Sequence, residues 1–165
     1  MSRQSSRAGL VAAAPAVLAA LIVALALHVQ LVAQANDTLL GTWILERGKS
    51  TFSGAVPERR TMTFEKVDGG IRHTTETLQG EVTYRLQYVF QIDGKDYPAD
   101  VQMPIASVSF KRIDAGKVER SGKYQGQVVE TVTYQVSANG KVLTVIQKGT
   151  TNGVEVTSTQ VFNRK

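Results

Sequence analysis

The residues that could carry out chemistry are few in this chain. Cysteine is absent, and the two histidines are His73 and His28, which follows a long apolar run. Without cysteine there are no thiol nucleophiles, thiolate metal sites or disulfides. A metal cluster or a Ser/His/acid arrangement would have to use His73, which lies in a threonine-rich stretch without a nucleophile-elbow motif. We therefore predict no catalytic residue, no metal site and no cofactor.

A second group of residues is suited to binding a ligand. The aromatic candidates are Tyr84, Tyr88, Phe90, Phe110 and Tyr134, and the polar candidates are Arg120, Glu130, Gln147 and Gln160. Small-molecule pockets combine such an apolar lining with a few polar groups that orient the ligand. Alternatively, Arg120 and Glu130 neutralise each other or lie at a solvated rim, and the rings fill an ordinary core. The choice depends on which faces of which elements carry these side chains.

Turn-forming glycines separate short stretches of alternating apolar and polar residues after residue 36, and no segment there keeps a helical period. The pattern predicts nine strands, near residues 41–46, 60–67, 71–78, 81–92, 105–113, 117–124, 128–137, 141–149 and 154–163, and a short tenth strand near Tyr97 is possible. So many sequential antiparallel strands leave exposed edges unless the sheet closes. We therefore predict an all-β, antiparallel up-and-down meander over residues 36–165, closed into a barrel of about 8–10 strands.

The inner face of the predicted barrel follows from segment 81–92, where the even-numbered residues are apolar. Turns at Gln79-Gly80 and Gly69-Gly70 extend this face, because a two-residue turn fixes which residues pair. The expected inward set is Thr75 opposite Tyr84, His73 opposite Leu86, and Met62 and Phe64 on the strand before them.

The turns of the C-terminal half extend the same face. The expected pairs are Phe110 with Arg120, Tyr124 with Val128, Gly122 with Glu130, and Gln147 with Ser158. Arg120 and Glu130 then become diagonal neighbours on the inner face. An inward charge must be paired, hydrated or bound to a ligand, because an isolated buried charge is too costly.

The N-terminal segment has the features of an export signal. Arg3 and Arg7 precede an uncharged run over residues 9–27, and Ala33-Gln34-Ala35 is a small-x-small pattern. We predict a signal peptide over residues 1–35 with cleavage after Ala35; the alternative is an uncleaved inner-membrane anchor, because the run is just long enough to span a bilayer. In both cases the two arginines favour a cytoplasmic N-terminus, so we expect the barrel to be periplasmic or secreted, or anchored outside the cytoplasm.

The charge of the barrel domain is mild. Without Arg3 and Arg7, the 19 basic residues become 17 against 14 acidic ones, which leaves a net charge of +3. Basic pairs such as Arg59-Arg60 are scattered and not interleaved with aromatic residues, which indicates a solvated surface. We expect no nucleic-acid partner, and a membrane partner only if the N-terminal segment is uncleaved; the oligomeric state is left open.

Gly41-Thr42-Trp43 at the first strand and the meander after it resemble the calycin group of lipocalins and fatty-acid-binding proteins. The chain is also similar to small exported bacterial lipocalin-like proteins of unassigned function, in "GTW", "KSTF", "DGKDYP", "FKRID", "GKVLTV" and the ending "TSTQVFNRK". The resemblance implies that Trp43 closes one end of the barrel and that Arg164, near the end of the last strand, covers it.

Two departures from this resemblance limit what it implies. Fatty-acid-binding proteins hold a carboxylate with an Arg-x-Tyr pair in the last strand, where this chain has Gln160-Val161-Phe162. They also insert a helical lid after the first strand, where this chain has the short loop 47–59. We expect an exported barrel that binds a small apolar or amphipathic ligand non-covalently. The alternatives are a packed, partner-binding envelope module and, less favoured, an isomerase or dehydratase that uses His73, Glu130 or Arg120 for proton transfer.

Overall fold

The alternating apolar residues form ten antiparallel strands in the computed structural model, which describes residues 37–101, 103–151 and 154–165. The strands are β1 (Gly41–Leu45), β2 (Arg59–Val67), β3 (Gly70–Gln79), β4 (Val82–Phe90), β5 (Asp96–Pro98), β6 (Ser107–Asp114), β7 (Lys117–Tyr124), β8 (Gln127–Val136), β9 (Val142–Thr151) and β10 (Val154–Arg164). The possible strand near Tyr97 is β5, and a 3-10 turn, η1 (Arg47–Lys49), follows β1. The predicted signal segment, residues 1–35, lies outside the described residues. Within the described part of the chain, no helix is long and apolar enough to cross a membrane.

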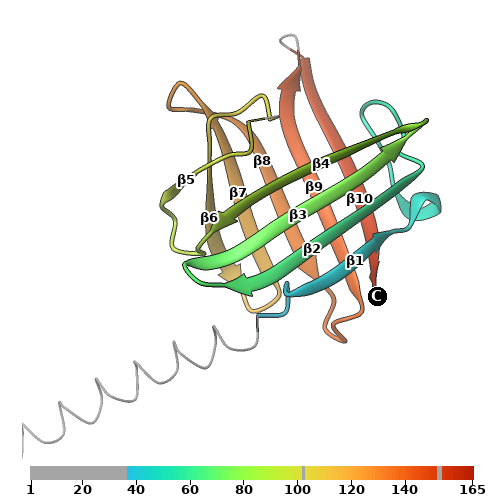
Figure 1. The fold of residues 1–165 in the computed structure, drawn as a ribbon, viewed down its shortest axis with the longest axis horizontal. Helices are drawn as coiled ribbons and strands as arrows, with labels where there is room; N and C mark the ends of the chain where they lie inside the picture. The colour runs from blue at the N-terminus through green and yellow to red at the C-terminus, as the bar shows by residue number, and fades with distance from the viewer. Residues whose placement is uncertain (1–36, 102, 152–153) are drawn as a thin grey trace, which may run out of the picture. The chain divides into compact units, whose positions relative to one another are not determined.

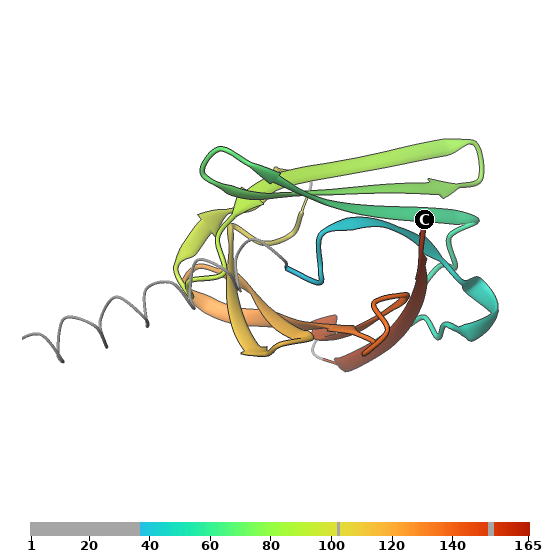
Figure 2. The same ribbon diagram turned by 90° about the horizontal axis from the view of Figure 1, so that it is seen from below.

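The ten strands form one sheet in the order β4-β3-β2-β1-β10-β9-β8-β7-β6-β5. Figure 1 shows β2, β3 and β4 crossing in front of β7 to β10, and Figure 2 shows the two layers enclosing the interior between them. Strands β1 and β10 join the layers by antiparallel pairing. The predicted closed meander is confirmed, with one seam at which the edge strands β4 and β5 are not neighbours in the ladder.

The strand registers of the C-terminal half agree largely with the turn analysis. Phe110 pairs with Arg120, Gly122 with Glu130, and Gln147 with Ser158, as predicted. The pairing of Tyr124 with Val128 is wrong. Gln125 and Gly126 both have positive φ, at 49° and 77°, and form a two-residue turn with a register shift after Gly122. The shift places Lys123 opposite Val128.

Two turns of the N-terminal half are displaced from their predicted positions. The β3–β4 turn is Gly80-Glu81, so that Thr75 pairs with Leu86 and His73 with Tyr88. Similarly, Val67 pairs with Gly70, which makes Asp68-Gly69 the β2–β3 turn. Each correction moves a pairing by two residues, and a shift of two preserves the face because side chains alternate with period two. The inward assignment is therefore confirmed although the partners are not.

Candidate ligand-binding site

On two strands that lie on opposite walls, β4 and β10, the inward-facing residues change from buried to exposed. On β4, Phe90 is fully buried at 0% exposure, whereas Tyr84 at the other end is 53% exposed. On β10, across the barrel, Phe162 is at 0% and Val154 at 64%. Opposite walls therefore agree that the barrel has a packed end and an open end. We call the inward side chains near the open end the mouth: Arg60, Thr77, Tyr84, Leu86, Arg120, Glu130, Gln147, Val156, Ser158 and Gln160.

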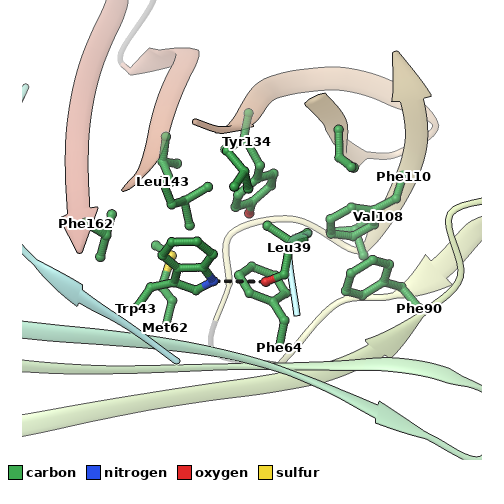
Figure 3. Close-up of a cluster of buried hydrophobic side chains, with 14 of the residues drawn as sticks. Leu39, Trp43, Met62, Phe64, Phe90, Val108, Phe110, Tyr134, Leu143 and Phe162 are labelled. Carbon is green, nitrogen blue, oxygen red and sulfur yellow. Dashed lines mark hydrogen bonds between the residues drawn. The ribbon is translucent and has the colours of Figure 1, made fainter. Parts of the chain in front are cut away.

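Trp43 fills the packed end and is satisfied there by two partners. Its indole N–H donates a hydrogen bond of 2.9 Å to the carbonyl oxygen of Leu39 (Figure 3). The guanidinium carbon of Arg164 lies 4.0 Å from the centre of the Trp43 ring, a cation–π geometry. The same guanidinium donates hydrogen bonds of 2.6–2.7 Å to the carbonyl oxygens of Thr38, Leu40 and Gly140. The structure thus places Arg164 over Trp43.

Aromatic rings fill the interior next to Trp43. Phe90 and Phe110 stack with their centres 3.5 Å apart, and Phe64 stacks on His73 at 4.5 Å (Figure 3 shows the phenylalanines). Tyr134 packs against both stacks, at 6.2 Å from Phe110 and 5.7 Å from Phe64. Of the five aromatic candidates, Tyr88, Phe90, Phe110 and Tyr134 are therefore buried together, whereas Tyr84 lies apart at the mouth.

His73 is a neutral, fully hydrogen-bonded residue of this core. Its Nδ1 lies 2.9 Å from the Tyr88 hydroxyl and its Nε2 lies 2.9 Å from the Thr75 hydroxyl. Burial, aided by the positive charge of Arg120, lowers the pKa of His73 to about 3. Burial likewise raises the pKa of Tyr88 and of Tyr134. These groups form a network that stays uncharged near neutral pH.

The predicted contact between Arg120 and Glu130 is an ion pair at the base of the mouth. The side chains are 6% and 16% exposed, so both charges are largely removed from water. Gln147 donates a hydrogen bond of 3.2 Å to Oε2 of Glu130. The Arg120 Nε is buried without a hydrogen-bond partner among the described residues. The structure thus brings together three of the four polar candidates and leaves one donor unused.

Gln160, the fourth polar candidate, contacts a residue that the sequence analysis placed on the surface. Arg60 is half-buried, and its Nη1 donates a hydrogen bond of 2.7 Å to Oε1 of Gln160. Its Nε donates a bond of 3.0 Å to the Thr77 hydroxyl, and burial lowers its pKa. The expectation of a solvated Arg59-Arg60 pair is wrong for Arg60, although Arg59 is exposed. Alternation from the inward Met62 would have placed Arg60 inside the barrel.

Comparisons with known proteins identify the fold. No protein-family model matches this chain, and no curated protein matches it. A Schistosoma mansoni fatty acid binding protein in complex with arachidonic acid is similar in structure, with a TM-score of 0.55 and 12% identity over 78% of this chain and 97% of that one. A zebrafish ileal bile acid-binding protein complexed with cholic acid has a TM-score of 0.51 and 10% identity over 78% and 99%. An extracellular fatty acid binding protein, As-p18, has a TM-score of 0.50 and 16% identity over 78% and 97%. The chain therefore has the lipocalin-like β-barrel fold of the fatty-acid-binding proteins.

Proposed function

We propose that the barrel binds a small amphipathic molecule non-covalently at its mouth. The observation that carries this proposal is the change along the inner face, from fully buried rings at one end, through buried polar side chains such as Arg120 and Gln160, to the exposed Tyr84 and Val154 at the other. A barrel whose only task is to fold has no need for inward charges that must be desolvated. The solved structures that share the fold include proteins bound to arachidonic acid and to cholic acid, which supports an amphipathic ligand.

The two halves of the interior have different tasks in this proposal. Phe90, Phe110 and Tyr134 form an aromatic floor that closes the interior beneath the ligand, since they are packed against one another. Tyr84 and Leu86 provide apolar surface on one wall of the mouth. On the other side, Gln147, Gln160 and the Arg120–Glu130 pair orient polar atoms of the ligand, as the few polar groups of a binding pocket do.

A tryptophan scan of β10 tests where the ligand binds. Val156 faces the mouth, whereas its neighbour Thr157 faces outward and is exposed. Nile red, a neutral apolar dye, should bind the wild-type barrel with an increase in fluorescence. Val156→Trp should weaken that binding at least tenfold because the indole occupies the mouth, and Thr157→Trp should leave it unchanged. Absence of dye binding by the wild type, or equal binding by both variants, would count against the proposal.

Catalysis is a weaker candidate function for the same residues. Both ring nitrogens of His73 are engaged by hydroxyl groups, and the Glu130 carboxylate is engaged by Arg120 and Gln147. A general base needs a free acceptor that faces the substrate. No specific feature favours a reaction, so binding is the function we propose.

We further propose that the barrel acts outside the cytoplasm. The support is the N-terminal sequence, in which Arg3 and Arg7 precede an uncharged run and Ala33-Gln34-Ala35 follows it. The mass of the protein recovered from cells tests this directly. Cleavage after Ala35 would give a chain that begins at Asn36 in the exported fraction, and an uncleaved anchor would give the full mass in the membrane fraction. Full-length protein in the cytoplasm would contradict export.

A further inference from the structure

The mouth contains more positive than negative charge. Its inward charged side chains, in the described part of the chain, are Arg60, Arg120 and Glu130. The Glu130 carboxylate neutralises Arg120, so that this pair has no net charge. Arg60 has no carboxylate within ion-pair distance among the described residues, and its half-buried guanidinium leaves the mouth with one uncompensated positive charge.

Arg60 is held by side chains of two other strands, β3 and β10. It lies on β2 and binds Gln160 on β10, and β1 separates these two strands in the sheet. The hydrogen bond of 2.7 Å therefore joins two side chains that are two strands apart in the sheet, beyond the end of β1 at Leu45. Thr77 on β3 fixes the Nε at 3.0 Å. These two neutral acceptors orient the guanidinium but supply no negative charge, and its other N–H groups have no partner among the described residues.

A half-buried cation with only neutral partners is costly unless an anion joins it. An arginine guanidinium presents its N–H groups in a planar fork that fits two oxygens of one anionic group. Arg120 is less suited to this role, because an anion beside it would be repelled by Glu130. The single uncompensated charge indicates a ligand with one negative charge rather than two.

We propose that Arg60, positioned by Thr77 and Gln160, is the residue that binds the anionic headgroup of the ligand, and that the ligand is an amphiphile with a single negative charge such as a carboxylate. This inference rests on the proposed function. It assigns the anion site to β2, whereas the last strand has a glutamine at its inward position. The apolar part of the ligand then extends along Leu86 and Tyr84 toward the aromatic floor.

Three amphiphiles built on a ten-carbon chain test the headgroup: decanoate, decan-1-ol and decyltrimethylammonium, each competing with Nile red. The wild-type barrel should bind decanoate at least tenfold more tightly than decan-1-ol and should bind the cation weakest. Raising the salt concentration should weaken decanoate binding but not that of the alcohol, because salt screens only the charged headgroup.

Arg60→Gln should lose the preference for decanoate, so that the ratio of its affinities for decanoate and decan-1-ol falls at least tenfold from the wild-type ratio. Arg60→Lys should retain part of the preference, because the charge remains but the planar fork is lost. Arg59→Gln is the matched control, since the neighbouring arginine is exposed, and it should behave as the wild type.

The possible failures are distinguishable. If no amphiphile and no dye binds the wild type, the proposed function fails. If all three amphiphiles bind equally, or if Arg60→Gln keeps the preference for decanoate, the function stands and the anion site is wrong. If Arg60→Gln does not fold, two other measurements decide. The assignment is overturned if Arg60→Lys prefers decanoate as strongly as the wild type does and if salt does not weaken the binding of decanoate to the wild type.

Discussion

Trp43 is buried, and its polar N–H group has a hydrogen-bond partner. Its ring is fully buried, its N–H is bound to the Leu39 carbonyl, and Arg164 covers its outer face. We expect Trp43→Ala to lower the free energy of unfolding by ~3–5 kcal/mol, because the cavity adds to the lost transfer energy. Trp43→Phe should cost less, since it keeps most of the apolar volume. Urea denaturation followed by circular dichroism measures both, and an unchanged midpoint for Trp43→Ala would refute the structural role.

His73 should make stability depend on pH. Its native pKa is lowered to about 3 from an ordinary 6.5, so the unfolded chain takes up a proton in a range where the native state does not. The contribution is complete above the unfolded pKa and is lost as the pH falls toward the folded pKa, with a slope of up to ~1.4 kcal/mol per pH unit. His73→Gln removes this slope. The difference in unfolding free energy between wild type and variant should therefore shrink from pH 7.5 to pH 4.5, and a constant difference would contradict the assignment.

At the residue scale, the sequence predicts faces better than it predicts partners. The contact between Arg120 and Glu130 can be predicted from turn lengths, because the two residues face inward on adjacent strands. The contact between Arg60 and Gln160 joins strands that are not neighbours, so no register argument reaches it. This contact depends on the distance between β2 and β10, which the alternation of side chains does not provide.

At the element scale, the sequence predicts the hairpins, but two of its turns differ by one residue from those in the structure. Gly80 can occupy either central position of a two-residue turn, so Gln79-Gly80 and Gly80-Glu81 are equally compatible with the sequence. The alternatives differ by two residues in register and place the same side chains inward. For β7–β8, the register shift after Gly122 is a local irregularity for which the sequence has no comparable signal.

Adjacent glycines at the β2–β3 turn provide a matched test of hairpin geometry. Both have positive φ, 86° at Gly69 and 147° at Gly70. A Cβ at Gly69 would meet open space, whereas one at Gly70 would overlap the Phe90 carbonyl oxygen on β4. We expect Gly69→Ala to cost about 1 kcal/mol from backbone strain alone, and Gly70→Ala to cost clearly more because β4 must move. Thermal denaturation of the two variants tests this ranking, and equal melting temperatures would show that β4 does not pack against the turn as described.

At the scale of the whole molecule, the barrel is closed by side chains where its ladder is interrupted. The edge strands β4 and β5 are not paired with each other. Across this seam the backbone N–H of Gln87 donates a hydrogen bond of 2.6 Å to the Asp100 carboxylate, and Phe90 stacks on Phe110. Backbone amides without ladder partners exchange readily. In hydrogen exchange, β4 should therefore exchange faster than β9, which is paired on both sides.

Substitution of Phe110 tests whether its stack with Phe90 holds the seam between β4 and β5 together. Phe110→Ala should lower the free energy of unfolding by ~3–5 kcal/mol and should increase exchange in β4 and β5 more than in β9 and β10. An increase spread evenly over all strands would mean that the stack contributes to global stability without holding the seam.

The change in exposure along the inner face separates the residues that keep the barrel folded from those that we propose contact a ligand. Substitutions at the packed end remove buried apolar volume, whereas substitutions at the exposed or partly exposed positions of the mouth, such as Tyr84 and Val156, remove little. Residues of the mouth can therefore change during evolution while the packed end maintains the stability of the fold. This arrangement reduces the usual trade-off between stability and a new binding specificity. For an engineer, the same property makes the mouth of this barrel a region in which specificity can be redesigned one residue at a time.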